Sequence, residues 1–257
     1  MGRVVSRGWR IEYDVVGAGP VVVLVAGLSM WRHQWIEFGY VAALADEFRV
    51  VSVDPLGHGD SDRPHTPGAY HSAGVAADIV AVLDAEEVST AVVWGFSAGA
   101  QIALGVASIA PSRVLAAVCG GGGWRNEAVA EAEWCHPLAD LVRSPGGLQQ
   151  FWAHVGFDDP DRVRTALARN DADAIAAALE GGTSWRPDYD ALLLPILSYK
   201  GDEEQLEYND ALMERLGADR HVLPHAGHMD CFERTEEVLG FVRPFLRTCA
   251  VHGPRRP

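Results

Sequence analysis

The chain has 257 residues, of which 48% are hydrophobic and 22% charged, a composition typical of a globular enzyme-sized domain rather than a disordered chain. Its formal net charge of −14 argues against a nucleic-acid partner, because phosphate binding needs clustered Lys and Arg. The four cysteines form no C-x-x-C pair, so free thiols in a reducing compartment are expected. With no signal-peptide core and no membrane-length apolar run, the sequence predicts a cytoplasmic protein without a membrane partner.

Short apolar runs rich in β-branched residues recur along the chain and predict strands. An alternating run at 10–16 predicts an edge or hairpin strand, and the others are typical of strands covered on both faces: 21–26, 49–53, 90–94, 114–119, 196–199 and 221–223. Helix-forming stretches lie between them at 34–47, 71–83, 98–110, 206–216 and 233–246. This alternation predicts a doubly wound α/β layer fold with a mostly parallel sheet.

The alternation of strands and helices is interrupted once, between 120 and 194, where no strand is predicted and short helical patterns are separated by proline and glycine. We therefore predict a core formed by 1–119 and 195–250, an inserted helical subdomain at 120–194, and a loose tail at 251–257. The insert holds half of the chain's eight tryptophans, namely Trp124, Trp134, Trp152 and Trp185. These rings either form the insert's own small core or provide an aromatic wall over a site.

The clearest chemical signal is a Gly-x-Ser-x-Gly sequence at 95–99, placed where an apolar strand gives way to a helix-forming stretch. A serine at such a sharp turn sits in strained backbone, and only residues without a Cβ fit closely on either side. The turn also places the hydroxyl at a helix N-terminus, where free N–H groups favour developing negative charge. The pattern therefore predicts that Ser97 is a nucleophile.

A serine nucleophile needs a base and an orienting acid. His228 is the candidate base, because it lies in a glycine-containing loop between a predicted strand and the last helix, with His225 as its rival. Metal binding by this pair is not expected, since no further ligand lies at suitable spacing. The acid is expected directly after the strand at 196–199, where Asp202 and Glu204 are both candidates.

These motifs resemble the α/β-hydrolase superfamily, in the lid-bearing branch of esterases, lactonases and C–C hydrolases. The resemblance rests on the serine turn at 95–99, the segment Asp-Pro-Leu-Gly-His-Gly-Asp-Ser-Asp at 54–62, Ala-Gly-His at 226–228, and Pro-Ile-Leu at 195–197 leading to Gly201. It implies an eight-stranded, mostly parallel sheet with 120–194 as a helical lid, a Ser-His-acid triad, and no metal or other cofactor.

The chain departs from the family pattern at two places. The family usually has His-Gly in the oxyanion-hole loop, whereas this chain has Ala26-Gly27; the resemblance implies Leu28 and Ala98 as the backbone donors. Members commonly place an aspartate three residues after the loop glycine, and here that position is Glu204. We favour Glu204 over Asp202 as the acid because Glu204 occupies this position and triads accept glutamate as well as aspartate.

The combined expectation is a serine hydrolase that cleaves an ester, thioester or lactone through an acyl-enzyme. Trp31, Trp124 and Trp152 are candidate substrate contacts, which favours a substrate with an apolar or aromatic part. The same triad could act as an acyltransferase that passes the acyl group to a thiol, amine or alcohol, with an acyl carrier as donor. A non-catalytic ligand-binding protein on a hydrolase fold is the alternative of another class.

Overall fold

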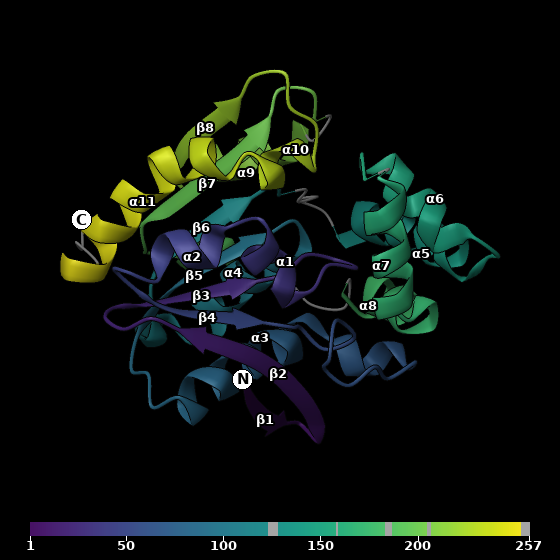
Figure 1. The fold of residues 1–257 in the computed structure, drawn as a ribbon, viewed down its shortest axis with the longest axis horizontal. Helices are drawn as coiled ribbons and strands as arrows, with labels where there is room; N and C mark the ends of the chain where they lie inside the picture. The colour runs from purple at the N-terminus through teal and green to yellow at the C-terminus, as the bar shows by residue number, and fades with distance from the viewer. Residues whose placement is uncertain (123–127, 158, 183–186, 205–206, 253–257) are drawn as a thin grey trace.

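The computed structural model describes residues 1–122, 128–157, 159–182, 187–204 and 207–252. Its centre is an eight-stranded sheet with the strand order β1-β2-β4-β3-β5-β6-β7-β8 (Figure 1). The strands are β1 Gly2–Ser6, β2 Trp9–Val16, β3 Val21–Val25, β4 Arg49–Val53, β5 Ala91–Phe96, β6 Val114–Gly120, β7 Ile196–Gly201 and β8 Asp219–Leu223. Only β2 runs antiparallel to its neighbours, so the predicted mostly parallel sheet is confirmed.

Strand β1 was not predicted from the sequence, because Val4 and Val5 break the alternation that marks an edge strand. It pairs with β2 through a turn at Arg7 and Gly8, whose φ angles are +51° and +86°. Two consecutive positive φ values give the tight turn whose twist matches a hairpin. The hairpin therefore depends on Arg7 adopting a conformation that its residue type seldom takes.

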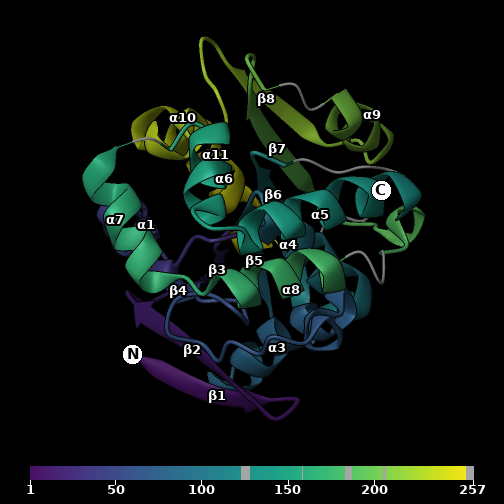
Figure 2. The same cartoon turned by 90° about the vertical axis from the view of Figure 1, so that its right-hand side faces the viewer.

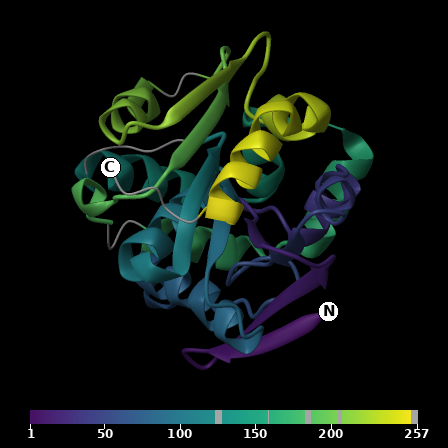
Figure 3. The ribbon, with the colours of Figure 1, turned by 90° about the vertical axis from the view of Figure 1, so that its left-hand side faces the viewer.

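Helices cover both faces of the sheet (Figure 3). One face is covered by α1 Arg32–Glu37, α2 Tyr40–Leu44, α10 Asp230–Glu233 and α11 Thr235–His252, and the other by α3 Ser72–Ala85, α4 Ala98–Ile109 and α9 Glu207–Arg215. A hydrophobic core lies between the sheet and the helices on each face. Alternate side chains of β5 enter the two cores: Val92 and Trp94 pack on the face of α1 and α11, whereas Val93 packs on the face of α3 and α4. Burial on both faces explains the continuous apolar runs.

Two of the predicted helices differ from the structure. The stretch at 34–47 is divided into α1 and α2, because Gly39 adopts φ +85° and ends the helical path there. At the other end of the chain, α11 continues to His252, two residues into the expected tail. Buried Cys249 near its end packs against the core and supports the extra turn; residues 253–257 lie outside the described part.

Between β6 and β7 the chain forms α5 Ala128–Arg143, α6 Gly147–His154, α7 Pro160–Arg169, α8 Ala172–Gly182 and a short 3₁₀ turn at Tyr189–Ala191. Two further 3₁₀ turns lie before this region, at Pro67–Tyr70 and Pro111–Arg113. These helices lie together at one edge of the molecule, facing the viewer in Figure 2. Strand β6 ends at Gly120, the residue at which the insert was expected to begin. Within the described residues, none of the helices has the length and apolarity needed to cross a membrane.

Candidate active site

Ser97 occupies the turn between β5 and α4 with φ +55° and ψ −123°, a strained backbone conformation for a residue with a side chain. Neither Gly95 nor Gly99 has room for a side chain. A Cβ on Gly95 would lie 2.0 Å from the carbonyl oxygen of Gly99, and a Cβ on Gly99 would lie 2.3 Å from the carbonyl oxygen of Val25. The N–H of Ser97 donates to the carbonyl of Gly120 at 2.7 Å, which ties the turn to β6.

The ring of His228 lies beside this turn, with its centroid 5.0 Å from that of Phe96. Its Nδ1 is 2.9 Å from Oε2 of Glu204, whose side chain is only 2% exposed. No hydrogen bond joins the ring to the Ser97 hydroxyl in the described part of the chain. Contacts between nucleophile and base are often long without substrate and tighten during the reaction.

Glu204 is held as a carboxylate by several donors. Burial opposes its ionisation, but the hydrogen bond and charge of His228, together with the N–H of Gly201, keep the pKa of the Glu204 carboxyl below its usual value. The N–H of Gly201 reaches Oε1 at 3.0 Å, and the Sγ of Cys231 lies 3.2 Å from the same oxygen. One oxygen is thus anchored by the protein while the other faces the imidazole.

Asp202 makes a different contact. Its Oδ1 accepts a hydrogen bond from the backbone N–H of Ala226 at 3.2 Å, in the loop that carries His228. Backbone N–H groups of His225 and Ala226 lower the pKa of the exposed Asp202 carboxyl. Of the two candidate acids, Glu204, which the sequence analysis favoured, contacts the ring, whereas Asp202 contacts the loop.

The loop after β3 packs directly against the serine turn. A Cβ on Gly27 would lie 2.9 Å from the carbonyl oxygen of Phe96 and 3.1 Å from the Cβ of Ser97, so only glycine fits there. The N–H of Met30 donates to the carbonyl of Gly27 at 3.1 Å and closes a tight turn around Leu28. Neither Leu28 nor Ala98 uses its N–H in a hydrogen bond to any residue that the structure describes.

A family model of the alpha/beta hydrolase fold matches residues 20–171, more than half of the chain. The chain belongs to the α/β-hydrolase family. The matched residues include strands β3 to β6 and the serine turn after β5. The fold that the sequence motifs implied is therefore confirmed.

Similar proteins cover nearly the whole length of this α/β-hydrolase. One named as a 2-succinyl-6-hydroxy-2,4-cyclohexadiene-1-carboxylate synthase, from Bacillus subtilis (strain 168), is 24% identical over 92% of this chain and 95% of its own. A thermophilic esterase from Thermogutta terrifontis gives a TM-score of 0.82 at 23% identity, over 97% of this chain and 99% of that one. An enzyme that degrades N-acyl homoserine lactones gives a TM-score of 0.74 at 26% identity, over 95% and 100%.

Of the three tryptophans predicted to contact substrate, the structure describes two, and both are buried. Trp152 is buried, packs edge-on against Phe157 with ring centroids 5.1 Å apart, and donates its indole N–H to the hydroxyl of Ser29 at 2.7 Å. Trp31 is also buried, at the start of α1, with the guanidinium of Arg169 5.9 Å from its ring centroid. Trp124 lies outside the described residues.

The contacts of Ser29 were not foreseen from the sequence. This residue lies in the loop after β3 with φ +58°, and its carbonyl accepts a hydrogen bond from the side chain of Asn170 at 2.9 Å. Together with the indole of Trp152, this places two donors of the helical insert on the loop that packs against Ser97. Only the fold brings these segments together, because more than 120 residues separate them in the chain.

One group of possible metal ligands occurs among the described residues: oxygen or nitrogen atoms of His65, Asp171 and Asp173 lie within 4.8 Å of one another. Asp171 already accepts hydrogen bonds from the backbone N–H groups of Asp173 and Ala174, and its other oxygen lies 2.9 Å from Nε2 of His65. The exposed cluster is therefore explained as a helix cap with an ion pair.

Proposed function

We propose that this protein is a serine hydrolase that cleaves an ester, thioester or lactone of a small apolar or aromatic substrate through an acyl-enzyme. Ser97 is the nucleophile, His228 the base and Glu204 the acid that orients the base. The observation that carries the proposal is the 2.9 Å contact of a buried glutamate with His228, whose ring packs beside the strained serine turn.

The chemistry follows from this arrangement. When Nδ1–H of His228 donates to Glu204, Nε2 remains unprotonated and can take the proton of the Ser97 hydroxyl as its oxygen attacks the substrate carbonyl. The N–H groups of Leu28 and Ala98 stabilise the oxyanion, and His228 returns the proton to the leaving group. Water then attacks the acyl-enzyme by the same route, releases the acid and restores Ser97.

The helical insert, α5 to α8, is proposed as a lid over this site. Support comes from the hydrogen bonds of Trp152 and Asn170 to Ser29, which hold the insert against the proposed oxyanion loop. Trp31 and Trp152 are then the candidate contacts for a flat or apolar acyl part. The similar esterase and the lactone-degrading enzyme favour an ester or lactone bond as the target.

Intact-protein mass spectrometry after treatment with a fluorophosphonate tests the nucleophile. We expect one adduct on the wild type and on Ser112→Ala, which changes an exposed serine remote from the turn, and none on Ser97→Ala. Hydrolysis of a p-nitrophenyl ester should fall to background only in Ser97→Ala. A wild type that neither forms an adduct nor turns over, even with a lid-opening detergent present, would favour the binding-protein alternative.

The rate at which the acyl-enzyme formed from the same ester is released distinguishes hydrolysis from acyl transfer. Hydrolysis predicts that the acyl-enzyme is released in water alone, at a rate that added thiols, amines or alcohols leave nearly unchanged. An acyl-enzyme that accumulates until such an acceptor is added would instead identify an acyltransferase.

A further inference from the structure

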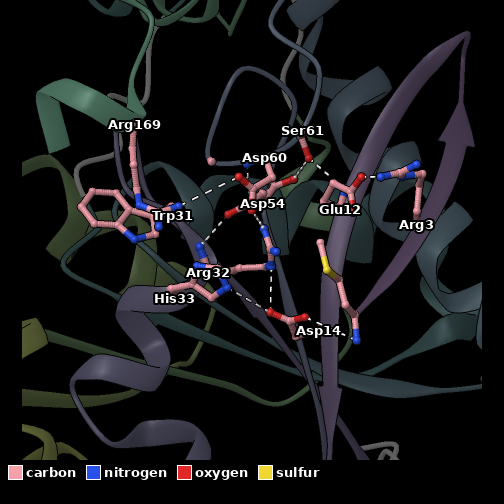
Figure 4. Close-up of polar contacts among 12 residues, drawn as sticks. Arg3, Glu12, Asp14, Trp31, Arg32, His33, Asp54, Asp60, Ser61 and Arg169 are labelled. Carbon is pink, nitrogen blue, oxygen red and sulfur yellow. Dashed lines mark hydrogen bonds and ion pairs between the residues drawn. The ribbon is translucent and has the colours of Figure 1, made fainter. Parts of the chain in front are cut away.

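A cluster of charged side chains surrounds the buried pair Arg32 and Asp54 and joins β2, the end of β4 and the start of α1 (Figure 4). Arg32 is the first residue of α1, and its side chain is only 1% exposed. Its Nε donates to Oδ2 of Asp14 at 2.9 Å, while its Nη1 contacts the carboxylates of Asp54 and, at 2.9 Å, Asp60. A guanidinium that leaves water this completely must be matched by carboxylates in fixed positions.

Asp54 is the centre of the cluster, and its side chain is fully buried. Its Oδ1 accepts the backbone N–H of Arg32 at 2.6 Å, and its Oδ2 accepts the backbone N–H of Asp60 at 2.9 Å in addition to the guanidinium. Its own backbone is fixed as well, through the carbonyl of Glu12 and the hydroxyl of Ser61. One carboxylate thus connects the end of β4 to the start of α1.

The loop between β3 and α1 is therefore fixed at two ends. At its beginning Gly27 is pressed against the serine turn, and at its end both the backbone and the side chain of Arg32 are bound to Asp54. Ala26 has no side-chain group that could hydrogen-bond the loop. Leu28, whose N–H bonds no residue that the structure describes, lies between the two anchors.

We infer that Asp54 and Arg32 are positioning residues that hold the N–H of Leu28 in the orientation that oxyanion stabilisation requires. This inference rests on the proposed function. Among the described residues, neither side chain hydrogen-bonds Ser97 or His228, so both would act through the backbone of the loop. Because the oxyanion forms only in the transition state, a loosened loop should lower kcat while leaving KM nearly unchanged.

The chain offers a matched control for the loss of a buried ion pair. Asp78 in α3 is 1% exposed and accepts from Nε and Nη2 of Arg7 at 2.9 and 2.6 Å, remote from the serine turn. We expect Asp54→Asn and Asp78→Asn both to lower the melting temperature. Only Asp54→Asn should lower kcat for a p-nitrophenyl ester, by about 10- to 100-fold with KM within about threefold, since a lost oxyanion donor costs about 10²–10³.

A boronic acid that forms a tetrahedral adduct with Ser97 provides a second readout, because its inhibition constant should weaken in parallel with kcat. Arg32→Lys keeps a cation beside Asp54 and should show a smaller loss of kcat at unchanged KM; it decides the question if Asp54→Asn does not fold. Equal kcat in Asp54→Asn and Asp78→Asn, or a loss expressed in KM alone, would overturn the inference. A wild type without turnover or serine labelling would instead overturn the proposed function, and this inference with it.

Discussion

Replacing Glu204 by glutamine removes the charge beside His228 while changing almost nothing in volume. In the wild type, Oε1 is held by the N–H of Gly201 and by Cys231, so Oε2 is the oxygen that faces Nδ1. An amide in this position keeps its carbonyl oxygen toward the N–H of Gly201 and turns its NH₂ group toward the imidazole. Nδ1 must then accept a hydrogen bond instead of donating one, so the single proton of the neutral ring lies on Nε2. A protonated Nε2 cannot take the proton of Ser97.

The wrong tautomer determines the size of the effect. Changing a triad acid to its amide costs about 10⁴ in kcat, or about 5 kcal/mol in the barrier, when the geometry is otherwise intact. We therefore expect Glu204→Gln to lower kcat for a p-nitrophenyl ester by about 10³–10⁴ with a small change in KM. Stopped-flow measurement of the first turnover should show the loss in the acylation step.

Asp202→Asn is the matched variant, because it makes the same chemical change in the other candidate acid. Asparagine keeps the oxygen that accepts the N–H of Ala226, so kcat should fall by no more than a few-fold. If Asp202→Asn reduced kcat as much as Glu204→Gln, or more, the assignment of the acid from ring contact would be wrong.

The remaining predictions concern stability. Burial lowers the pKa of His58 from 6.5 to about 4, so the unfolded chain takes up a proton in this window that the folded protein does not. His58 should therefore lower the free energy of unfolding by up to about 1.4 kcal/mol per pH unit as pH drops from 6.5 toward 4. Urea titrations of His58→Gln should show a pH dependence smaller by this contribution, and equal slopes would contradict it. Gly95→Ala should prevent native packing, because its methyl group would meet the backbone of Gly99 at 2.0 Å. By contrast, a Cβ on Gly240, inside α11, would meet no atom within 4 Å, so Gly240→Ala should stabilise the protein by about 0.5–1 kcal/mol in the same titrations. A loss of stability would contradict the inference that a methyl group fits at this position.

Local patterns in the sequence determined most of the fold. The β-branched runs at 49–53 and 114–119 predicted strands that the structure contains, because a strand buried on both faces needs continuous apolar residues. The glycines around Ser97 predicted the turn because their lack of a Cβ is a local requirement. The prediction of a single helix at 34–47 was wrong. An isolated glycine is tolerated inside a helix, so the sequence did not indicate that Gly39 adopts a left-handed conformation in the folded protein.

Contacts between distant segments were decided only by the tertiary structure. Glu204 and Asp202 lie in one turn, and no local pattern specifies which carboxylate meets a histidine 24 residues away from Glu204. Likewise, the sequence contained Arg32 and Asp54, 22 residues apart, without indicating that they pair at the end of the loop that contains Leu28. Residue type and spacing specify backbone conformation, whereas the pairing of charges depends on where the sheet brings the ends of its strands together.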